Sequence, residues 1–390
     1  MFSSRTEWHL EENRLTRLLR ECTARGDAIL DLTETNPTRC GFLAPSWLLE
    51  SISTTSSLFY EPDPKGLPEA RSALARWYGA RGLHVNPDSI FLTASTSEAY
   101  YILFRLLCNS GDEVLLPRPG YPLFDILASL SDIRIVPYDL RYDGEWHFDI
   151  ESIRAGMSDR TRAIVIVTPN NPTGSFLKKD EWREIEAMAI NRHCAVIADE
   201  VFSAFHFEKD PQRIASLSES SNVLTFTLNG LSKLAGLPQM KLAWMTVSGP
   251  ETEYRPALNR LELISDTLLS VATPIQRAVP LILQEIESFT APILTRVSHN
   301  ESVLRSRVDS ASGVSVFRLE GGWNAIVRVP ATRSDEDWAL ELLQSAGVLV
   351  HPGHLFDCAM GTCLVISLLP AHETFAKAID RIVKRFTAGT

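Results

Sequence analysis

One lysine lies where a reactive side chain could be held rigidly. In NGLSKLAGLPQMKLAW (229–244) a strand pattern ends near Thr227, a Gly/Ser turn follows, and Lys233 comes directly after it. A lysine that forms a Schiff base must sit at the end of a rigid element, in surroundings that let its ammonium lose a proton. Taken alone, a lysine in this setting is more often a surface residue. Whether Lys233 is reactive must therefore be judged from the other segments of the chain.

A carboxylate ends a second strand-like run. Asp199 in ADEVF (198–202) follows the apolar stretch CAVIA and would lie at the carboxyl edge of a parallel sheet, where ligands bind in such folds. An anion at that edge can keep a pyridinium nitrogen protonated, so that the ring serves as an electron sink. The alternative is a helix N-cap after a strand.

Two loops place further side chains at strand ends. Asn171 in TPNNPTG (168–174) could bond a ring hydroxyl, although the same residues suit a plain turn. Tyr121 in PRPGYPLF (117–124) could stack on a flat ring or pack as an ordinary aromatic.

A run of small hydroxyl residues leads from a strand into a helix. Ser95, Thr96 and Ser97 lie in TASTSEA (93–99), where hydroxyls and backbone N–H groups could hold a phosphate. An ordinary Ser/Thr cap with Glu98 in the first turn fits equally well.

These segments need a sheet to position them, and the chain predicts one of about seven strands. The runs are apolar at nearly every position, which is typical of strands covered on both faces, and helical patterns such as 68–82 and 178–192 separate them. The fold class is therefore α/β, with a mostly parallel seven-stranded sheet between helices. The predicted strands are 89–93, 112–117, 133–138, 163–168, 194–199, 222–227 and 241–247.

The rest of the chain predicts a second, smaller α+β domain. Residues 7–25 form an amphipathic helical pattern, about 250–310 are helical, and strands and helices alternate after 313. We expect residues 1–45 to be an N-terminal arm of the small domain, 46–260 the large domain, and 261–390 a connecting helix with the small domain.

Composition excludes several classes of protein. The 390 residues are 45% hydrophobic and 22% charged, with a net charge of −10, which argues against a nucleic-acid or anionic-membrane surface. No apolar run is long enough to span a bilayer and no signal core opens the chain, so we expect a cytoplasmic protein. The six cysteines have no metal-binding spacing, and we expect no metal and free thiols.

Taken in order, the segments resemble the class I/II aminotransferase family of fold-type I pyridoxal-phosphate (PLP) enzymes. The resemblance runs from about residue 30 to 385. TASTSEA, PGYP, NNPTG, DEVF and SKLAGLPQMKLAW match the family's phosphate, ring-stacking, asparagine, aspartate and lysine segments. YEPDPKGLPEARSALARWY (60–78) and HPGHLFD (351–357) match two further motifs.

The resemblance implies PLP as cofactor and a role for each residue. Lys233 would form the internal aldimine and shuttle a proton, while Asp199 would pair with the ring nitrogen. Asn171 would bond the ring oxygen and Tyr121 would stack on the ring. The phosphate would contact Ser95, Thr96 and Ser97, with Ser232 and Lys241 nearby, and Tyr60 of a partner subunit, which implies a homodimer with shared sites.

Two departures from the family concern the cofactor. Lys241 stands where the family has arginine, so it can supply charge but no bidentate fork. Phe202 stands where the family has tyrosine, which removes a donor to the ring oxygen and predicts a more basic aldimine.

A third departure concerns the substrate. Val365, in CLVISLLP (363–370), occupies the position of the arginine that clamps the α-carboxylate. Another basic residue could bind the carboxylate instead. Arg39 is the first candidate, and Arg328 and Lys65 are weaker ones. Alternatively, the amine donor has no α-carboxylate. Three further residues are candidates for substrate contact: Asn36, Trp323 and Asn324.

The sequence therefore predicts amino-group transfer from an amine or amino acid to a keto acceptor, with no nucleic acid or membrane partner. A PLP-dependent lyase or decarboxylase on the same fold remains the related alternative. A non-catalytic PLP-binding module is the alternative from another class, although the chain has no room for an appended DNA-binding domain.

Overall fold

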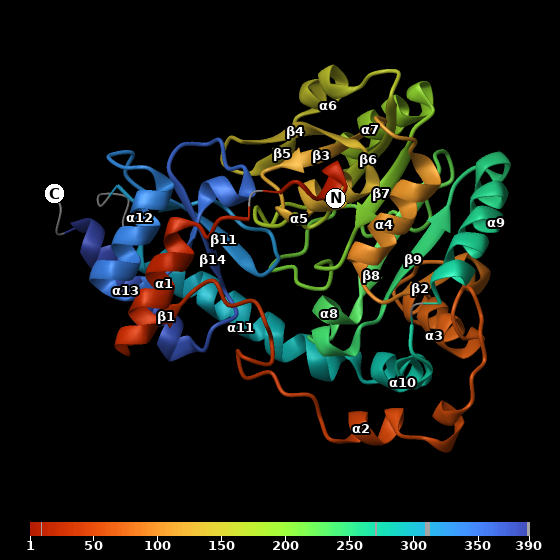
Figure 1. The fold of residues 1–390 in the computed structure, drawn as a ribbon, viewed down its shortest axis with the longest axis horizontal. Helices are drawn as coiled ribbons and strands as arrows, with labels where there is room; N and C mark the ends of the chain where they lie inside the picture. The colour runs from red at the N-terminus through yellow and green to blue at the C-terminus, as the bar shows by residue number, and fades with distance from the viewer. Residues whose placement is uncertain (9, 270, 309–312, 388–390) are drawn as a thin grey trace.

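The apolar runs in the first two-thirds of the chain assemble into one large sheet. The computed structural model describes residues 1–8, 10–269, 271–308 and 313–387. Within them this sheet has eight strands in the order β2-β9-β8-β7-β6-β3-β4-β5, and pairing from β8 to β4 is parallel (Figure 1). The predicted α/β class is confirmed. The strands are β2 (Ile90–Thr93), β3 (Glu113–Arg118), β4 (Arg134–Tyr142), β5 (Trp146–Phe148), β6 (Thr161–Val167), β7 (Ala195–Asp199), β8 (Thr225–Gly230) and β9 (Ala243–Ser248).

The eighth strand, β5, is the one that the sequence pattern does not predict. It pairs antiparallel with the end of β4, where Leu140 faces Phe148. Trp146 and Phe148 are buried on either side of the half-exposed His147. Three residues are too few for this alternation to be recognised beside an Asp-Gly turn.

Helices cover both faces of the sheet, as strands without a polar face require. In β6, Ala163 and Val165 pack on one face with α4, α5 and α9, whereas Ile164 and Ile166 pack on the other with α6 and α7. These helices are α4 (Thr96–Leu107), α5 (Leu123–Ser131), α6 (Ile150–Gly156), α7 (Lys179–Arg192) and α9 (Glu251–Leu268).

A third apolar cluster lies at the β2–β9 edge, where α2, α3, α8 and α10 pack together (Figure 1). The helices are α2 (Trp47–Ile52), α3 (Pro68–Gly79), α8 (Leu231–Leu234) and α10 (Thr273–Gln284). This packing surrounds the short helix that carries Lys233.

The C-terminal third forms the predicted smaller α+β unit, reached through the long helix α11 (Figure 1). Its sheet has the order β10-β11-β14-β13, and the N-terminal strand β1 pairs in parallel with β12. The proposed domain boundaries at 45 and 260 stay a prediction. The elements are β1 (Leu30–Asp31), α11 (Ile286–Arg307), β10 (Ser315–Val316), β11 (Asn324–Arg328), α12 (Asp335–Glu341), β12 (Val348–Leu349), β13 (His351–Pro352), β14 (Cys363–Ser367) and α13 (His372–Thr387).

The first helix, α1 (Arg14–Arg25), begins later than the predicted residue 7. Asn13 caps it, because its Oδ1 accepts a hydrogen bond of 2.7 Å from the backbone N–H of Thr16. Trp8 consequently lies outside the helix.

Two expectations from composition can be compared with the structure. All six cysteines are free thiols, as predicted. Among the described residues, no helix has both the length and the apolar character needed to cross a bilayer.

Candidate active site

A cavity of about 590 Å³ opens where the carboxyl ends of the parallel strands face the small sheet. Residues of both sheets line it, together with Thr35 of the N-terminal segment. Such a position, outside the strand ends of an open α/β sheet, is where ligands bind. Eleven of the predicted site residues line this cavity: Ser95, Thr96, Ser97, Tyr121, Asn171, Asp199, Ser232, Lys233, Lys241, Trp323 and Asn324.

Lys233 lies on α8, which begins directly where β8 ends. A Cβ at Gly230 would stand 2.8 Å from the Cβ of Ala243, so the strand end and the start of the helix need glycine there. The Lys233 Nζ lies 5.1 Å from the ring centroid of Trp323 and 5.5 Å from that of Phe202. Burial lowers the pKa of Lys233, while Asp199 opposes the shift. The amine is therefore held in surroundings that favour its neutral, nucleophilic form.

Asp199 is the last residue of β7, and its carboxylate accepts two hydrogen bonds. Tyr100 Oη donates to Oδ2 over 3.0 Å, and the backbone N–H of Val201 donates to Oδ1 over 3.2 Å. Burial raises the pKa of Asp199 to about 6, against the effects of these bonds and of Lys233. Neither hydrogen-bond partner is a cation, so a cationic ring nitrogen bound here would gain a buried counter-ion.

Tyr100 also lines the cavity, and sequence reasoning missed it. It lies on α4, four residues after Thr96, and residues four apart share one face of a helix. This spacing was the available signal, because Thr96 was already a candidate.

The hydroxyl run serves both as a helix cap and as part of the cavity wall. Ser95 is the N-cap of α4 and its Oγ accepts a hydrogen bond from the backbone N–H of Glu98 over 3.1 Å. Glu98 completes the cap, since its Oε2 accepts from the N–H of Ala94 over 2.6 Å. Thr96 and Ser97 follow in the first turn, where an anion is favoured.

Asn171 is held by a residue of the small sheet. The Nδ2 of Asn324 donates to the Oδ1 of Asn171 over 2.7 Å, which leaves the Nδ2 of Asn171 to act as a donor. The two loops approach closely: Gly174 has φ +71°, and a side chain there would collide with the backbone of Gly321.

Four other candidates lie outside the residues that line the cavity. Arg39 is exposed and pairs with Glu34 at 3.4 Å, whereas Asn36 turns its Oδ1 to the N–H of Thr38. Lys65 forms an ion pair with Glu262 over 3.3 Å. The guanidinium of Arg328 stacks on Phe317, 4.8 Å from the ring centroid.

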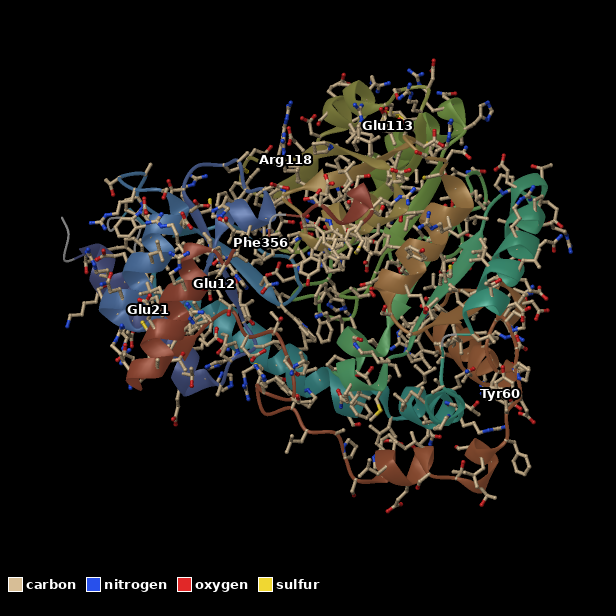
Figure 2. All side chains as sticks on the ribbon, viewed as in Figure 1. Glu12, Glu21, Tyr60, Glu113, Arg118 and Phe356 are labelled. Atoms are coloured by element: carbon tan, nitrogen blue, oxygen red, sulfur yellow. The ribbon has the colours of Figure 1, made fainter. Side chains whose placement is uncertain are left out.

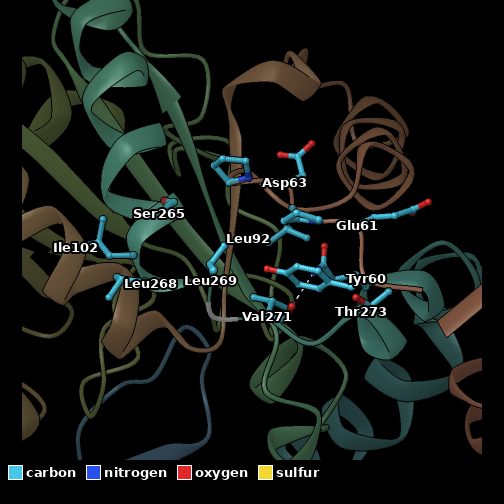
Figure 3. A pocket seen from close by; sticks show the side chains of 14 residues that line it. Tyr60, Glu61, Asp63, Leu92, Ile102, Ser265, Leu268, Leu269, Val271 and Thr273 are labelled. Atoms are coloured by element: carbon cyan, nitrogen blue, oxygen red, sulfur yellow. Dashed lines mark hydrogen bonds between the residues drawn. The ribbon is translucent and has the colours of Figure 1, made fainter. Parts of the chain in front are cut away.

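Tyr60 also lies away from the cavity. It is 73% exposed and lines a separate small pocket with Asp63 and Leu269 (Figure 3). Figure 2 shows Tyr60 at the edge of the molecule, far from Phe356, which lines the main cavity. Within its own subunit Tyr60 therefore takes no part in the site.

Val365 occupies the middle of the small sheet. It is fully buried on β14, paired with Ile326 of β11 on one side and His351 of β13 on the other. Cross-strand partners project from the same face of a sheet, and His351 lines the cavity, so residue 365 belongs to the face that closes it.

The fold and the site define a class of protein: an α/β protein that holds a partly buried lysine and a buried carboxylate together at one edge of its sheet. The family model "Aminotransferase class I and II" matches residues 29–382. The chain belongs to this family, as the sequence motifs predicted.

Relatives of known structure and activity agree with this assignment. Glutamate-pyruvate aminotransferase AlaA of Escherichia coli is 30% identical over 373 residues, covering 93% of this chain and 91% of that protein. The structure of an alanine aminotransferase from Pyrococcus furiosus matches with a TM-score of 0.90 at 25% identity, covering 100% of both chains. S-alkyl-thiohydroximate lyase SUR1 of Arabidopsis thaliana is 31% identical over 248 residues, 62% of this chain and 53% of that protein.

Membership of the family implies PLP, and the cavity has the groups to receive it. A buried carboxylate whose hydrogen-bond donors are both neutral, Asp199, suits a protonated pyridine nitrogen. The first turn of α4 and Lys241 suit a phosphate, and Lys233 suits an aldehyde.

Proposed function

We propose that this aminotransferase anchors PLP on Lys233 and works with a carboxylate site that lacks the usual arginine. The observation that carries the proposal is the convergence of Lys233 and Asp199 in one cavity, the lysine with a lowered pKa and the carboxylate with neutral hydrogen-bond donors.

Each lining residue then has a part. Asp199 would pair with the ring nitrogen, Asn171 would donate to the ring oxygen, and Tyr121 would cover the ring. Five polar residues of the wall would hold the phosphate: Ser95, Thr96, Ser97, Ser232 and Lys241. When bound, PLP supplies an aldehyde that takes up the amino group and a ring that accepts electrons.

Lys233 would have a second task, as the base for the reaction. Its amine, beside the rings of Phe202 and Trp323, would take the proton from the amine-bearing carbon of the substrate and return it during product formation. Desolvation favours this role, because lowering the pKa of Lys233 increases the share of amine that is free to accept a proton.

We also propose a cytoplasmic homodimer with shared sites, in which Tyr60 reaches the phosphate of the partner subunit. The support is an exposed apolar strip that includes Leu58, Phe59 and Tyr60, which are 83%, 63% and 73% exposed. Such a strip is typical of an interface. A monomer at micromolar concentration in light scattering would contradict this part.

A lyase is the second candidate, favoured by the similarity to SUR1 over part of the chain. The test is turnover of amines and amino acids with and without a carbonyl acceptor. Acceptor-dependent cycling of the cofactor between its aldehyde and amine forms supports transfer. Acceptor-independent release of ammonia supports the lyase, and cofactor binding without either reaction supports a non-catalytic module.

A further inference from the structure

The wall around Lys233 is short of positive charge. Among the described residues that line the cavity, Lys233 and Lys241 are the lysine and arginine side chains. In the proposed function the first is committed to the cofactor and the second to its phosphate. His351 adds no charge, because burial lowers its pKa, with Asp31 opposing the shift.

The small sheet lines the cavity with two polar side chains that bring no cation to it, Asn324 and His351. Val365 packs with Ile326 and Phe356 in one buried cluster, and the neighbouring Leu355 also lines the cavity. A cation at position 365 would stand between His351 and Ile326 on the cavity side, but this chain has valine there. A carboxylate brought to this wall would lose its hydration without gaining a counter-ion.

The segment that carries Tyr60 is a poor source of the missing charge, if a partner subunit brings it to the site. The segment from residue 40 to 64 carries the exposed Tyr60, and it contains no lysine or arginine. Its charged residues are acidic: Glu50, Glu61 and Asp63. The cations that flank the segment are already paired, Arg39 with Glu34 and Lys65 with Glu262.

Aromatic side chains supply the apolar surface beside Lys233. Phe202 and Trp323 meet edge to face, with ring centroids 5.3 Å apart, beside the Nζ of Lys233. Tyr121 and Phe124 line the same cavity from the loop and helix after β3. A substituent on the reacting carbon therefore meets aromatic and aliphatic surface.

From this distribution of charge we propose that the amino donor carries no carboxylate on its amine-bearing carbon, and that its substituent there is apolar or aromatic. This inference rests on the aminotransferase function proposed above and specifies the class of amino donor. In the first half-reaction the amino group passes to the cofactor and the donor leaves as an aldehyde or ketone. The second half-reaction runs the same steps in reverse on a second carbonyl compound, so no outside oxidant or reductant is needed.

The test uses the full-length protein loaded with PLP and matched pairs that differ in the α-carboxylate alone. The pairs are ethylamine and L-alanine, isobutylamine and L-valine, and phenethylamine and L-phenylalanine. The absorbance of the bound cofactor reports conversion from its aldehyde form to its amine form. We expect the amine of at least one pair to react about 100-fold faster than its amino acid, because an unpaired buried charge carries a large penalty.

A gain-of-charge variant provides the second arm. Val365→Arg places a cation on the cavity face, and it should shift the preference toward the amino acid by about tenfold or more. Val365→Leu is the matched control and should leave the preference unchanged. Should the arginine variant fail to fold, the wild-type comparison decides alone.

The outcomes separate this inference from the function on which it rests. An amino acid that reacts as fast as its amine, or faster, overturns the substrate class and leaves the aminotransferase intact. Loss of that reaction in Arg39→Ala would then assign the carboxylate to Arg39. If PLP binds but no member of any pair converts it, the proposed transfer itself is overturned.

Discussion

Tyr100 Oη donates a hydrogen bond of 3.0 Å to Asp199 Oδ2, and both side chains are buried. The bond joins the first turns of α4, which would hold the phosphate, to the end of β7, which would hold the ring nitrogen. Tyr100 is thus a positioning residue that acts through Asp199 rather than on the substrate.

Tyr100→Phe should weaken PLP binding by about tenfold, because a hydrogen bond to a buried carboxylate contributes roughly 1.5–3 kcal/mol. It should also raise the pKa of Asp199 further, since the lost bond favoured the charged form. Titration of the apoprotein with PLP at several pH values measures both effects.

Tyr138→Phe is the matched control. Tyr138 is fully buried, and its hydroxyl donates to the carbonyl oxygen of Val165 over 2.8 Å, away from the cavity lining. If the two variants bind PLP equally well, Tyr100 has no positioning role.

Asp199 should make the apoprotein less stable as the pH rises. Burial raises its pKa to about 6 in the folded chain, above the ordinary value of 3.8, so the folded state binds more protons between these values. The stabilisation that the protonated Asp199 gives the folded state is fully present below about pH 3.8 and is lost as the pH passes through about 6. The total change in the free energy of unfolding is on the order of 3 kcal/mol.

Asp199→Asn removes this titration. Urea unfolding of the two apoproteins should show the stability of wild type, relative to the variant, falling between pH 4 and pH 7. Glu200, whose pKa burial raises to about 7, is present in both proteins and largely cancels. A relative stability that is flat or rises over this range would contradict the prediction.

Phe202 should set the pH at which the colour of the bound cofactor changes. Its buried ring is 5.5 Å from the Nζ of Lys233 and offers no hydroxyl to the ring oxygen. Phe202→Tyr should lower the apparent pKa of the cofactor absorbance by about one unit, because a donor stabilises the deprotonated state. Phe202→Leu, which adds no donor, should leave it unchanged, and equal shifts in both variants would exclude the explanation.

Asn324 should act on the cofactor through Asn171. Because the two amides share a 2.7 Å hydrogen bond, the losses in PLP affinity from Asn171→Ala and Asn324→Ala should overlap rather than add. A double-mutant cycle with a coupling energy of about 0.5 kcal/mol or more is expected. Additive losses would show that Asn324 acts independently.

Much of this site could be predicted from the sequence because its residues follow strand ends. Lys233 and Asp199 each come directly after a buried apolar run, and parallel strands bring such ends to one edge. The importance of Val365 was predicted from its position in a family motif. Its pairing with His351 was not predicted, because the register between strands of the small sheet depends on tertiary structure.

Contacts that join distant helices and loops were harder to predict from the sequence. Tyr100 meets Asp199 across 99 residues of sequence, and Asn324 meets Asn171 across 153. No local pattern encodes such pairs, since they depend on how α4 and the small sheet pack against the strand ends. The position of the Arg39 side chain could not be predicted either. Arg39 lies in a loop, where no helix or strand periodicity indicates a direction, and its ion pair with Glu34 depends on the local conformation of that loop.

Reduction of the PLP-loaded protein with borohydride, followed by peptide mapping, examines the covalent anchor itself. The expected result is one labelled peptide, containing Lys233, that disappears in Lys233→Ala. A label on Lys241 or another lysine, or none on a protein that has bound PLP, would contradict the account.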